Sequence, residues 1–191
     1  MTTAADFLAA APERIELDAD VVVRTYAPED MPQLVDVVNR NLEHLRPFMP
    51  WAQQPATVEA QTAWWRGTME PRDDGTGDLA YGIFATSGAL LGGTGFHARG
   101  APGVVEIGYW LTADAAGHGL MTRVTAALVD VARQLDGVQQ VEIKCDVANT
   151  RSAAIPRRLG FRLDRTEPRE PAAAGETGTD QVWALDLSSS G

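Results

Sequence analysis

Apolar and polar residues alternate along several short segments of the chain, as they do in half-buried strands. Residues 15–17 and 21–26 alternate in this way on either side of Asp18-Ala19-Asp20, which predicts a first hairpin. A second hairpin is predicted over residues 79–86 and 90–97, because Ser87-Gly88-Ala89 between them favours a turn. Three further strands are predicted over residues 104–111, 141–146 and 182–187.

Other segments place apolar residues at helical spacing. The first such helix opens near Pro28, and the longest covers residues 119–135. Another starts near Thr57, and a short one covers residues 152–159, where Pro156 must lie in the first turns or cause a kink. Strands that come first and then alternate with helices indicate an α/β or α+β fold with a mixed sheet.

Length and composition narrow the classes of function. The chain has 191 residues, 45% of them hydrophobic, which fits a single domain over residues 1–187 and a disordered tail at 188–191. The formal net charge of −10 disfavours nonspecific binding to nucleic acid or membranes. One cysteine, Cys145, permits no intrachain disulfide, and without a signal-peptide pattern a cytoplasmic location is the expectation. We interpret Cys145 as a buried packing thiol.

A loop with two glycines, Gly117 and Gly119, joins the strand at 104–111 to the longest helix. A helix N-terminus presents free backbone N–H groups, to which an anion such as a pyrophosphate binds. Two glycines alone are a weak signal. The loop lacks the Lys-Ser/Thr pair of a P-loop and the third glycine of a dinucleotide-binding fingerprint.

Several separated motifs in this chain resemble the GNAT N-acetyltransferases, and within them the RimJ/RimL-like group that acetylates ribosomal-protein N-termini. The matching residues are Leu45-Arg46-Pro47-Phe48-Met49-Pro50-Trp51, Gly108-Tyr109-Trp110-Leu111, Gly117-His118-Gly119, Met121-Thr122, Asn149, Ser152, Ala154-Ile155-Pro156 and Leu159-Gly160-Phe161. The resemblance implies a GNAT fold, with a mixed, mostly antiparallel sheet in which the parallel strands 104–111 and 141–146 splay apart.

The resemblance also implies acetyl-CoA as co-substrate, with no metal. Its pyrophosphate would rest on the backbone of Ala116, Gly117, His118, Gly119, Leu120, Met121 and Thr122. The pantetheine arm would lie along Tyr109, Trp110 and Leu111, with Asn149 and Ser152 nearby. Two positions depart from the family pattern: Ala116 replaces a Gln or Arg, and Met121 replaces a small residue. Backbone amides bind the phosphates, so we expect weaker binding at most.

Three side chains are catalytic candidates. Glu106, in an apolar strand, is the leading general base, with a salt-bridged surface carboxylate as the equal alternative. Glu170 is a second carboxylate candidate, although a solvated loop position is the more ordinary explanation. The resemblance makes Ser152 the proton donor to the leaving thiolate; otherwise it is a helix N-cap, and Asn149 a turn residue.

The remaining polar and aromatic candidates have ordinary structural explanations. His118 faces phosphate or solvent, whereas His44 and His97 are isolated in the sequence. No cluster has metal-ligand spacing. Phe48 and Trp51 pack in a core or, as the resemblance allows, line the acceptor groove.

The acceptor amine is left open by the sequence. The resemblance favours a protein or peptide N-terminus of ribosomal type. The alternatives are a small amine such as a polyamine or aminoglycoside, a succinyl-CoA-type acyltransferase, and a CoA-binding module without turnover. A homodimer is a further expectation from the resemblance.

Overall fold

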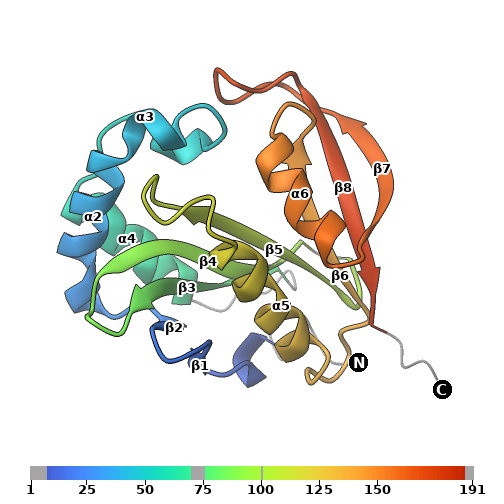
Figure 1. Ribbon diagram of the computed structural model, residues 1–191, viewed down its shortest axis with the longest axis horizontal. Coiled ribbons are helices and arrows are strands. Elements are labelled where there is room, and N and C mark those ends of the chain that lie inside the picture. Colours follow the sequence, from blue (N-terminus) through green and yellow to red (C-terminus); the bar gives the residue numbers. More distant parts are fainter. Residues whose placement is uncertain (1–7, 70–75, 100, 188–191) are drawn as a thin grey trace.

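The computed structural model describes residues 8–69, 76–99 and 101–187. Its centre is an eight-stranded sheet with the order β1-β2-β3-β4-β5-β6-β8-β7 (Figure 1). The strands are β1 (Arg14–Glu16), β2 (Val21–Thr25), β3 (Gly77–Ala85), β4 (Leu90–Ala98), β5 (Val104–Leu111), β6 (Gln140–Asp146), β7 (Arg162–Pro168) and β8 (Thr179–Asp186). All neighbouring strands in this sheet are antiparallel except β5 and β6, which are parallel.

Helices cover both faces of the sheet, and each face has its own apolar core. On one face lie α2 (Met31–Arg40), α3 (Leu42–Leu45) and α4 (Val58–Met69), with the 3-10 turns η1 (Pro28–Asp30) and η2 (Pro50–Ala52). On the other face lie α5 (Leu120–Ala132) and α6 (Thr150–Arg158), away from the first group (Figure 1). Strand alternation divides the two cores: Val21 and Val23 contact the α5 side, whereas Val22 contacts the α2 side.

The parallel pair separates after three residues of each strand. Val104, Val105 and Glu106 of β5 pair with Gln140, Val141 and Glu142 of β6, and the pairing ends there. The remaining residues of both strands diverge, so the β6-facing edge of β5 is unpaired beyond Glu106. The fold class and the splayed parallel strands expected from the sequence are confirmed.

Several boundaries differ from the sequence-based predictions. Pro156 lies well inside α6, and Asn149 rather than Ser152 is the N-cap of that helix. Pro50 opens the 3-10 turn η2, which was not among the predicted elements. Strand β7 was not predicted, because its residues are polar and almost all exposed, as suits an edge strand. The predicted tail at 188–191 lies outside the described residues.

Candidate active site

A cavity of about 760 Å³ opens on the α2 face of the sheet and extends to the gap between β5 and β6. Side chains from α2, α4, η2, the central strands, α6 and the β7–β8 loop line it. Aromatic and apolar side chains alternate there with charged ones, a mixture typical of small-molecule sites. The cavity therefore gives access from one face of the sheet to the edge of β5 that is left unpaired.

On the opposite side of that gap, the loop after β5 leads into α5. Gly117 and Gly119 have φ values of 86° and 77°, in the left-handed region that favours glycine. The backbone N–H groups of Gly119, Leu120, Met121 and Thr122 donate no hydrogen bond within the described part of the chain. Four consecutive free donors at a helix N-terminus form a site suited to a phosphate or pyrophosphate.

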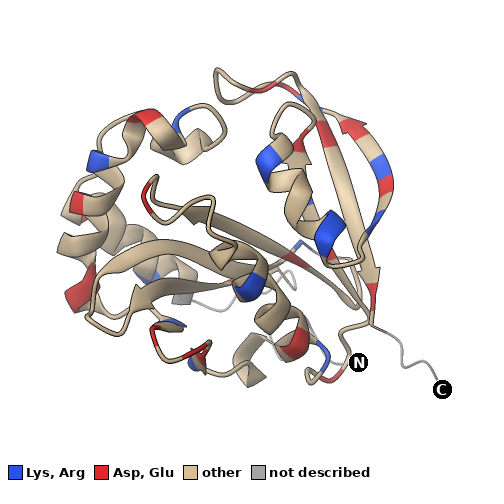
Figure 2. Cartoon of the chain, viewed as in Figure 1, with Lys and Arg blue, Asp and Glu red and all other residues tan. Residues whose placement is uncertain are grey.

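Cationic side chains surround this loop unevenly. Arg123 in the first turn of α5 is 2.9 Å from Asp18, so part of its charge is already neutralised. Arg151, Arg157 and Arg158 are exposed on α6, the neighbouring helix (Figure 2). These arginines supply positive potential on the α6 side of the loop.

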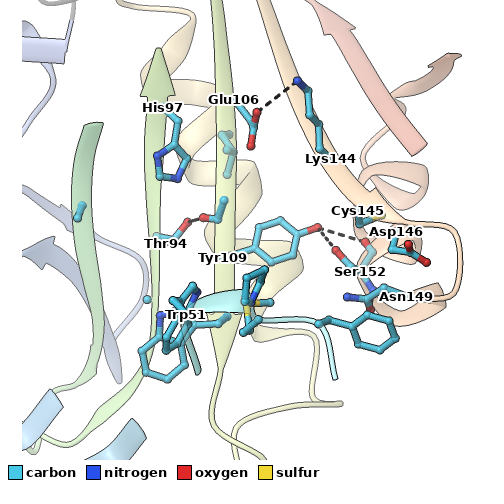
Figure 3. Close-up of a pocket in the computed structure, with 18 of the residues that line it drawn as sticks. Trp51, Thr94, His97, Glu106, Tyr109, Lys144, Cys145, Asp146, Asn149 and Ser152 are labelled. Atoms are coloured by element: carbon cyan, nitrogen blue, oxygen red, sulfur yellow. Dashed lines mark hydrogen bonds and ion pairs between the residues drawn. The ribbon is translucent and has the colours of Figure 1, made fainter. Parts of the chain in front are cut away.

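Pro156 explains how Tyr109 and Ser152 come together. Proline has no N–H, so the Ser152 carbonyl four residues earlier lacks its usual helical partner. The Tyr109 hydroxyl donates to that carbonyl oxygen at 3.1 Å, and the Ser152 hydroxyl donates to the Tyr109 oxygen at 3.2 Å (Figure 3). The Asn149 side chain accepts from the Ser152 N–H at 3.1 Å and fixes the start of α6. Two hydroxyl groups thus meet in the gap between β5 and α6.

The chemical state of these groups follows from their burial. Burial raises the pKa of the Tyr109 hydroxyl, and the hydrogen bond with Ser152 only partly offsets this rise, so the phenol keeps its proton. Burial also raises the pKa of the Cys145 thiol to about 11. Cys145 is buried in the α5-side core, as expected, but it also lines the cavity and contacts Ser152.

On the α2 face of the sheet, charged side chains form a row across four strands. Glu106 on β5 lies 3.7 Å from the ammonium of Lys144 on β6. His97 on β4 is the cross-strand neighbour of Glu106 (Figure 3). The Nδ1 atom of His97 lies 2.6 Å from Asp78 on β3. Arg99 binds the same Asp78 oxygen at 2.9 Å. The interpretation of His97 as isolated was wrong, because the β3–β4 register places Asp78 directly opposite it.

The end of β6 is fixed to the β7–β8 loop through Asp146. Its buried carboxylate accepts from the N–H groups of Ala148, Thr177 and Gly178 and from the Thr177 hydroxyl. Burial opposes ionisation, but these donors outweigh it and lower the pKa of Asp146. The same loop reaches the segment before η2, where the Gly175 N–H donates to the Pro47 carbonyl at 2.9 Å.

The structure brings most of the predicted site residues together. Glu106, Tyr109, Trp110, Asn149, Ser152, Phe48 and Trp51 all line the cavity. Trp51 is 49% exposed and packs edge-on against Trp110, with ring centroids 5.7 Å apart. Leu111, the last residue of β5, does not line the cavity. Residues 116–122 do not line it either and belong to the loop site.

Glu170 is exposed and is not among the residues that line the cavity, so the structure does not bring it together with the other candidates.

Over the described ranges, no three His, Cys, Asp or Glu side chains are grouped so that they hold a metal ion. No helix within these ranges has both the length and the apolarity needed to span a membrane.

Comparison with known proteins assigns this arrangement to a family. The model described as "Acetyltransferase (GNAT) domain" matches residues 20–162, which is well over half of the chain. The chain belongs to the GNAT acetyltransferase family, as the motifs indicated, and is an acetyltransferase by that membership.

Individual relatives share the whole fold at low sequence identity. The self-immunity acetyltransferase MccE of microcin C7, solved with acetyl-CoA and AMP, is 20% identical, with a TM-score of 0.81 over 92% of this chain and 97% of that one. RimL, a ribosomal L7/L12 alpha-N-protein acetyltransferase solved with coenzyme A, is 25% identical, with a TM-score of 0.79 over 91% and 98%. YdaF of Bacillus subtilis (strain 168), named provisionally as a ribosomal N-acetyltransferase, is 24% identical over 76% of this chain and 80% of its own.

Proposed function

We propose that this protein transfers the acetyl group of acetyl-CoA to the N-terminal amine of a protein or peptide. The observation that carries the proposal is the run of four free N–H groups at the start of α5, directly after the strand that separates from β6. The pyrophosphate of acetyl-CoA binds these donors together with the neighbouring loop residues Gly117 and His118. Ala116 was also expected to bind it, but the Ala116 N–H already donates to the Thr112 carbonyl at 3.1 Å. This placement leads the pantetheine arm along Tyr109, Trp110 and Leu111 into the gap.

The reaction is a direct attack on the thioester, with no covalent enzyme intermediate. The acceptor enters the cavity from the α2 face, and its ammonium group approaches Glu106, which holds the positive charge and assists its deprotonation. The free amine attacks the thioester carbonyl carbon, the C–N bond forms, and the C–S bond then breaks. Ser152, hydrogen-bonded to Tyr109, returns a proton to the sulfur of the departing thiolate.

The choice of a peptide acceptor rests on the relatives and on the mouth of the cavity. RimL acts on a ribosomal protein N-terminus, and YdaF is named for a similar activity. Phe48 and the half-exposed Trp51 line the cavity beside Trp110, where they offer apolar contact to the first residues of a peptide. We therefore assign Phe48 and Trp51 to the acceptor site, and a cytoplasmic homodimer of single-domain subunits completes the proposal.

A thiol-release screen tests the acceptor. Acetyl-CoA is offered with peptides that differ in their N-terminal residue, and with polyamines and aminoglycosides at the same concentrations. The proposal expects release with at least one peptide and a kcat/KM well above that for any small amine. Preferential release with a polyamine or aminoglycoside would instead identify a small-molecule acetyltransferase. Binding of acetyl-CoA without release for any amine would indicate a non-catalytic module.

The roles of the two leading side chains are tested separately. Glu106→Gln keeps the shape of the side chain and removes the charge, and Ser152→Ala removes only the hydroxyl. Each variant is expected to lower kcat/KM by about 10²-fold or more, the usual size of a general acid or base contribution. Glu170→Gln is the matched carboxylate variant outside the cavity, and its role stays a prediction. An unchanged rate in Glu106→Gln or Ser152→Ala removes that residue from the mechanism.

A further inference from the structure

A histidine that lines the cavity, and the carboxylate that contacts it, have no part in the mechanism so far. His97 and Asp78 form a close pair on β4 and β3, and His97 lies directly beside Glu106 (Figure 3). We propose that His97, oriented by Asp78, is the base that takes the proton from the acceptor ammonium, while Glu106 holds the charge of that ammonium. This inference rests on the proposed acetyl transfer to an amine and adds a catalytic residue to it.

The pairing with Asp78 sets the tautomer of His97. An ionised carboxylate 2.6 Å from Nδ1 requires a hydrogen on that nitrogen, so the neutral ring has its lone pair on Nε2. Arg99, 2.9 Å from the same carboxylate oxygen, favours the ionised form of Asp78. The imidazole therefore presents a proton acceptor at Nε2, the atom that faces away from Asp78.

The position of Nε2 is set by a glycine on the next strand. A Cβ atom added to Gly108 would lie 2.7 Å from Nε2, so the ring leans over Gly108 and needs the absence of a side chain there. Gly108 immediately precedes Tyr109, whose hydroxyl meets Ser152 in the gap between the strands. His97, Gly108 and Glu106 all line the cavity. Nε2 thus lies on the acceptor side of the place where the thioester is expected.

Charged groups of both signs lie around His97. The ionisable groups of the row are Asp78 on β3, Arg99 just after β4, Glu106 on β5 and Lys144 on β6. From α4, the cavity is lined by Gln61 and Trp64, which carry no charge. The Glu106 carboxylate forms an ion pair with Lys144 at the long distance of 3.7 Å. The carboxylate is therefore still able to attract the ammonium group of the acceptor. An imidazole, with a reference pKa of about 6.5, is better matched than a carboxylate to proton transfer at neutral pH.

The proton balance of the step is complete. Nε2 takes one proton from the ammonium, and the nitrogen lone pair so released attacks the thioester carbonyl carbon. When the C–S bond breaks, the sulfur keeps the electron pair. The nitrogen loses its second proton, Ser152 gives a proton to the sulfur, and the proton from the nitrogen restores the Ser152 hydroxyl. The imidazolium then gives its proton to solvent, so one proton is released for each amide formed.

The decisive variant is His97→Asn. The Asn amide nitrogen takes the place of Nδ1 and keeps the hydrogen bond to Asp78, but nothing replaces Nε2. Exposed His44 on α3 provides the matched control as His44→Asn. For the best amine from the screen, we expect His97→Asn to lower kcat/KM about 10²- to 10³-fold at pH 7, and His44→Asn to leave it unchanged.

The pH profile separates a base from a structural residue. The loss in His97→Asn should shrink as pH rises above the pKa of about 8 of an α-amino acceptor, because the amine then arrives without its proton. Binding of acetyl-CoA, measured by calorimetry, should be equal in both variants. A constant loss at every pH, or full activity in His97→Asn, overturns the inference and leaves acetyl transfer intact. A wild-type protein that releases no thiol with any amine overturns the proposed function itself.

A second measurement applies even when the variant does not fold. Nitrogen NMR of the histidine-labelled wild-type protein reports the tautomer of each ring. The inference expects the neutral form of the His97 ring to have its hydrogen on Nδ1 and a free Nε2. A neutral ring with its hydrogen on Nε2 contradicts the role of base.

Discussion

Replacing Asp146 by Asn changes one atom in the buried junction between β6 and the β7–β8 loop. The carboxylate is 3% exposed and accepts from three backbone N–H groups and one hydroxyl. An amide has only one oxygen, so its NH₂ group must face either the Ala148 N–H or the N–H groups of Thr177 and Gly178. We expect the orientation in which only the Ala148 hydrogen bond is lost, because the other orientation loses two.

The magnitude follows from two contributions. One charge-assisted hydrogen bond to a buried side chain is lost, and the partly buried Ala148 N–H is left without its acceptor; each of these two changes costs about 1–3 kcal/mol. Partial relaxation of the loop reduces the total, so we expect a loss of about 2–4 kcal/mol in the free energy of unfolding. For a domain of this length, that loss lowers Tm by about 5–15 °C.

The assay is thermal and denaturant unfolding as a function of pH. Because the pKa of Asp146 is lowered in the folded protein, its stabilisation is full above the reference value of about 3.9 and is lost as the pH falls through the folded value. The difference between wild type and Asp146→Asn should therefore narrow below about pH 4. Exposed Asp136, with no hydrogen bond or ion pair to the described residues, gives the control Asp136→Asn. A loss below about 0.5 kcal/mol, the range of ordinary surface substitutions, refutes the reasoning.

Three further predictions concern the site itself. Gly119→Ala adds a methyl group in open space at φ 77°, so it should lower the free energy of unfolding by about 1–2 kcal/mol and abolish tight CoA binding in calorimetry. Gly88→Ala, at φ 91° and equally open, should lower the free energy of unfolding by the same amount and bind CoA normally. Cys145, with a pKa of about 11, has about 300-fold less thiolate at pH 7.5 than a free cysteine. Iodoacetamide should therefore label Cys145 slowly, as followed by mass spectrometry. Labelling at the rate of a free thiol contradicts its burial. Trp51→Ala should raise the KM for the acceptor about tenfold, because one aromatic contact contributes about 1.4 kcal/mol, and should leave the KM for acetyl-CoA unchanged. Equal changes in the two KM values contradict the place of Trp51 in the acceptor site.

Local patterns were sufficient for the elements that hold the cofactor loop. The alternating apolar residues of β5 and the apolar stripe of α5 predicted both elements to within three residues, because one face of each packs in the core. Strand β7 could not be found in this way, since an exposed edge strand needs no apolar alternation. Glu106 and Ser152 were predicted as site residues from the sequence, but the residues that they contact in the structure, Lys144 and Tyr109, were not predicted as their partners.

Those partners are distant in the sequence. Asp78 lies 19 residues before His97 and just outside the strand predicted over residues 79–86, and only the β3–β4 register places it opposite that ring. The predicted turn Ser87-Gly88-Ala89 would pair Thr86 with Leu90 and set Asp78 opposite Ala98. The observed register includes a β-bulge between Ile83 and Phe84, so the hairpin prediction alone could not identify the pair. Tyr109 and Ser152 are 43 residues apart, and their contact depends on the carbonyl that Pro156 leaves without a helical partner.

Calorimetric titration of the wild-type protein with coenzyme A, beside pantetheine, which lacks the diphosphate, tests most directly whether the loop before α5 binds the cofactor. The account predicts one saturable site for coenzyme A, and an affinity for pantetheine at least about 100-fold lower, because several charge-assisted N–H bonds are then missing. Equal affinities for the two molecules, or no heat with coenzyme A at millimolar concentration, would contradict it.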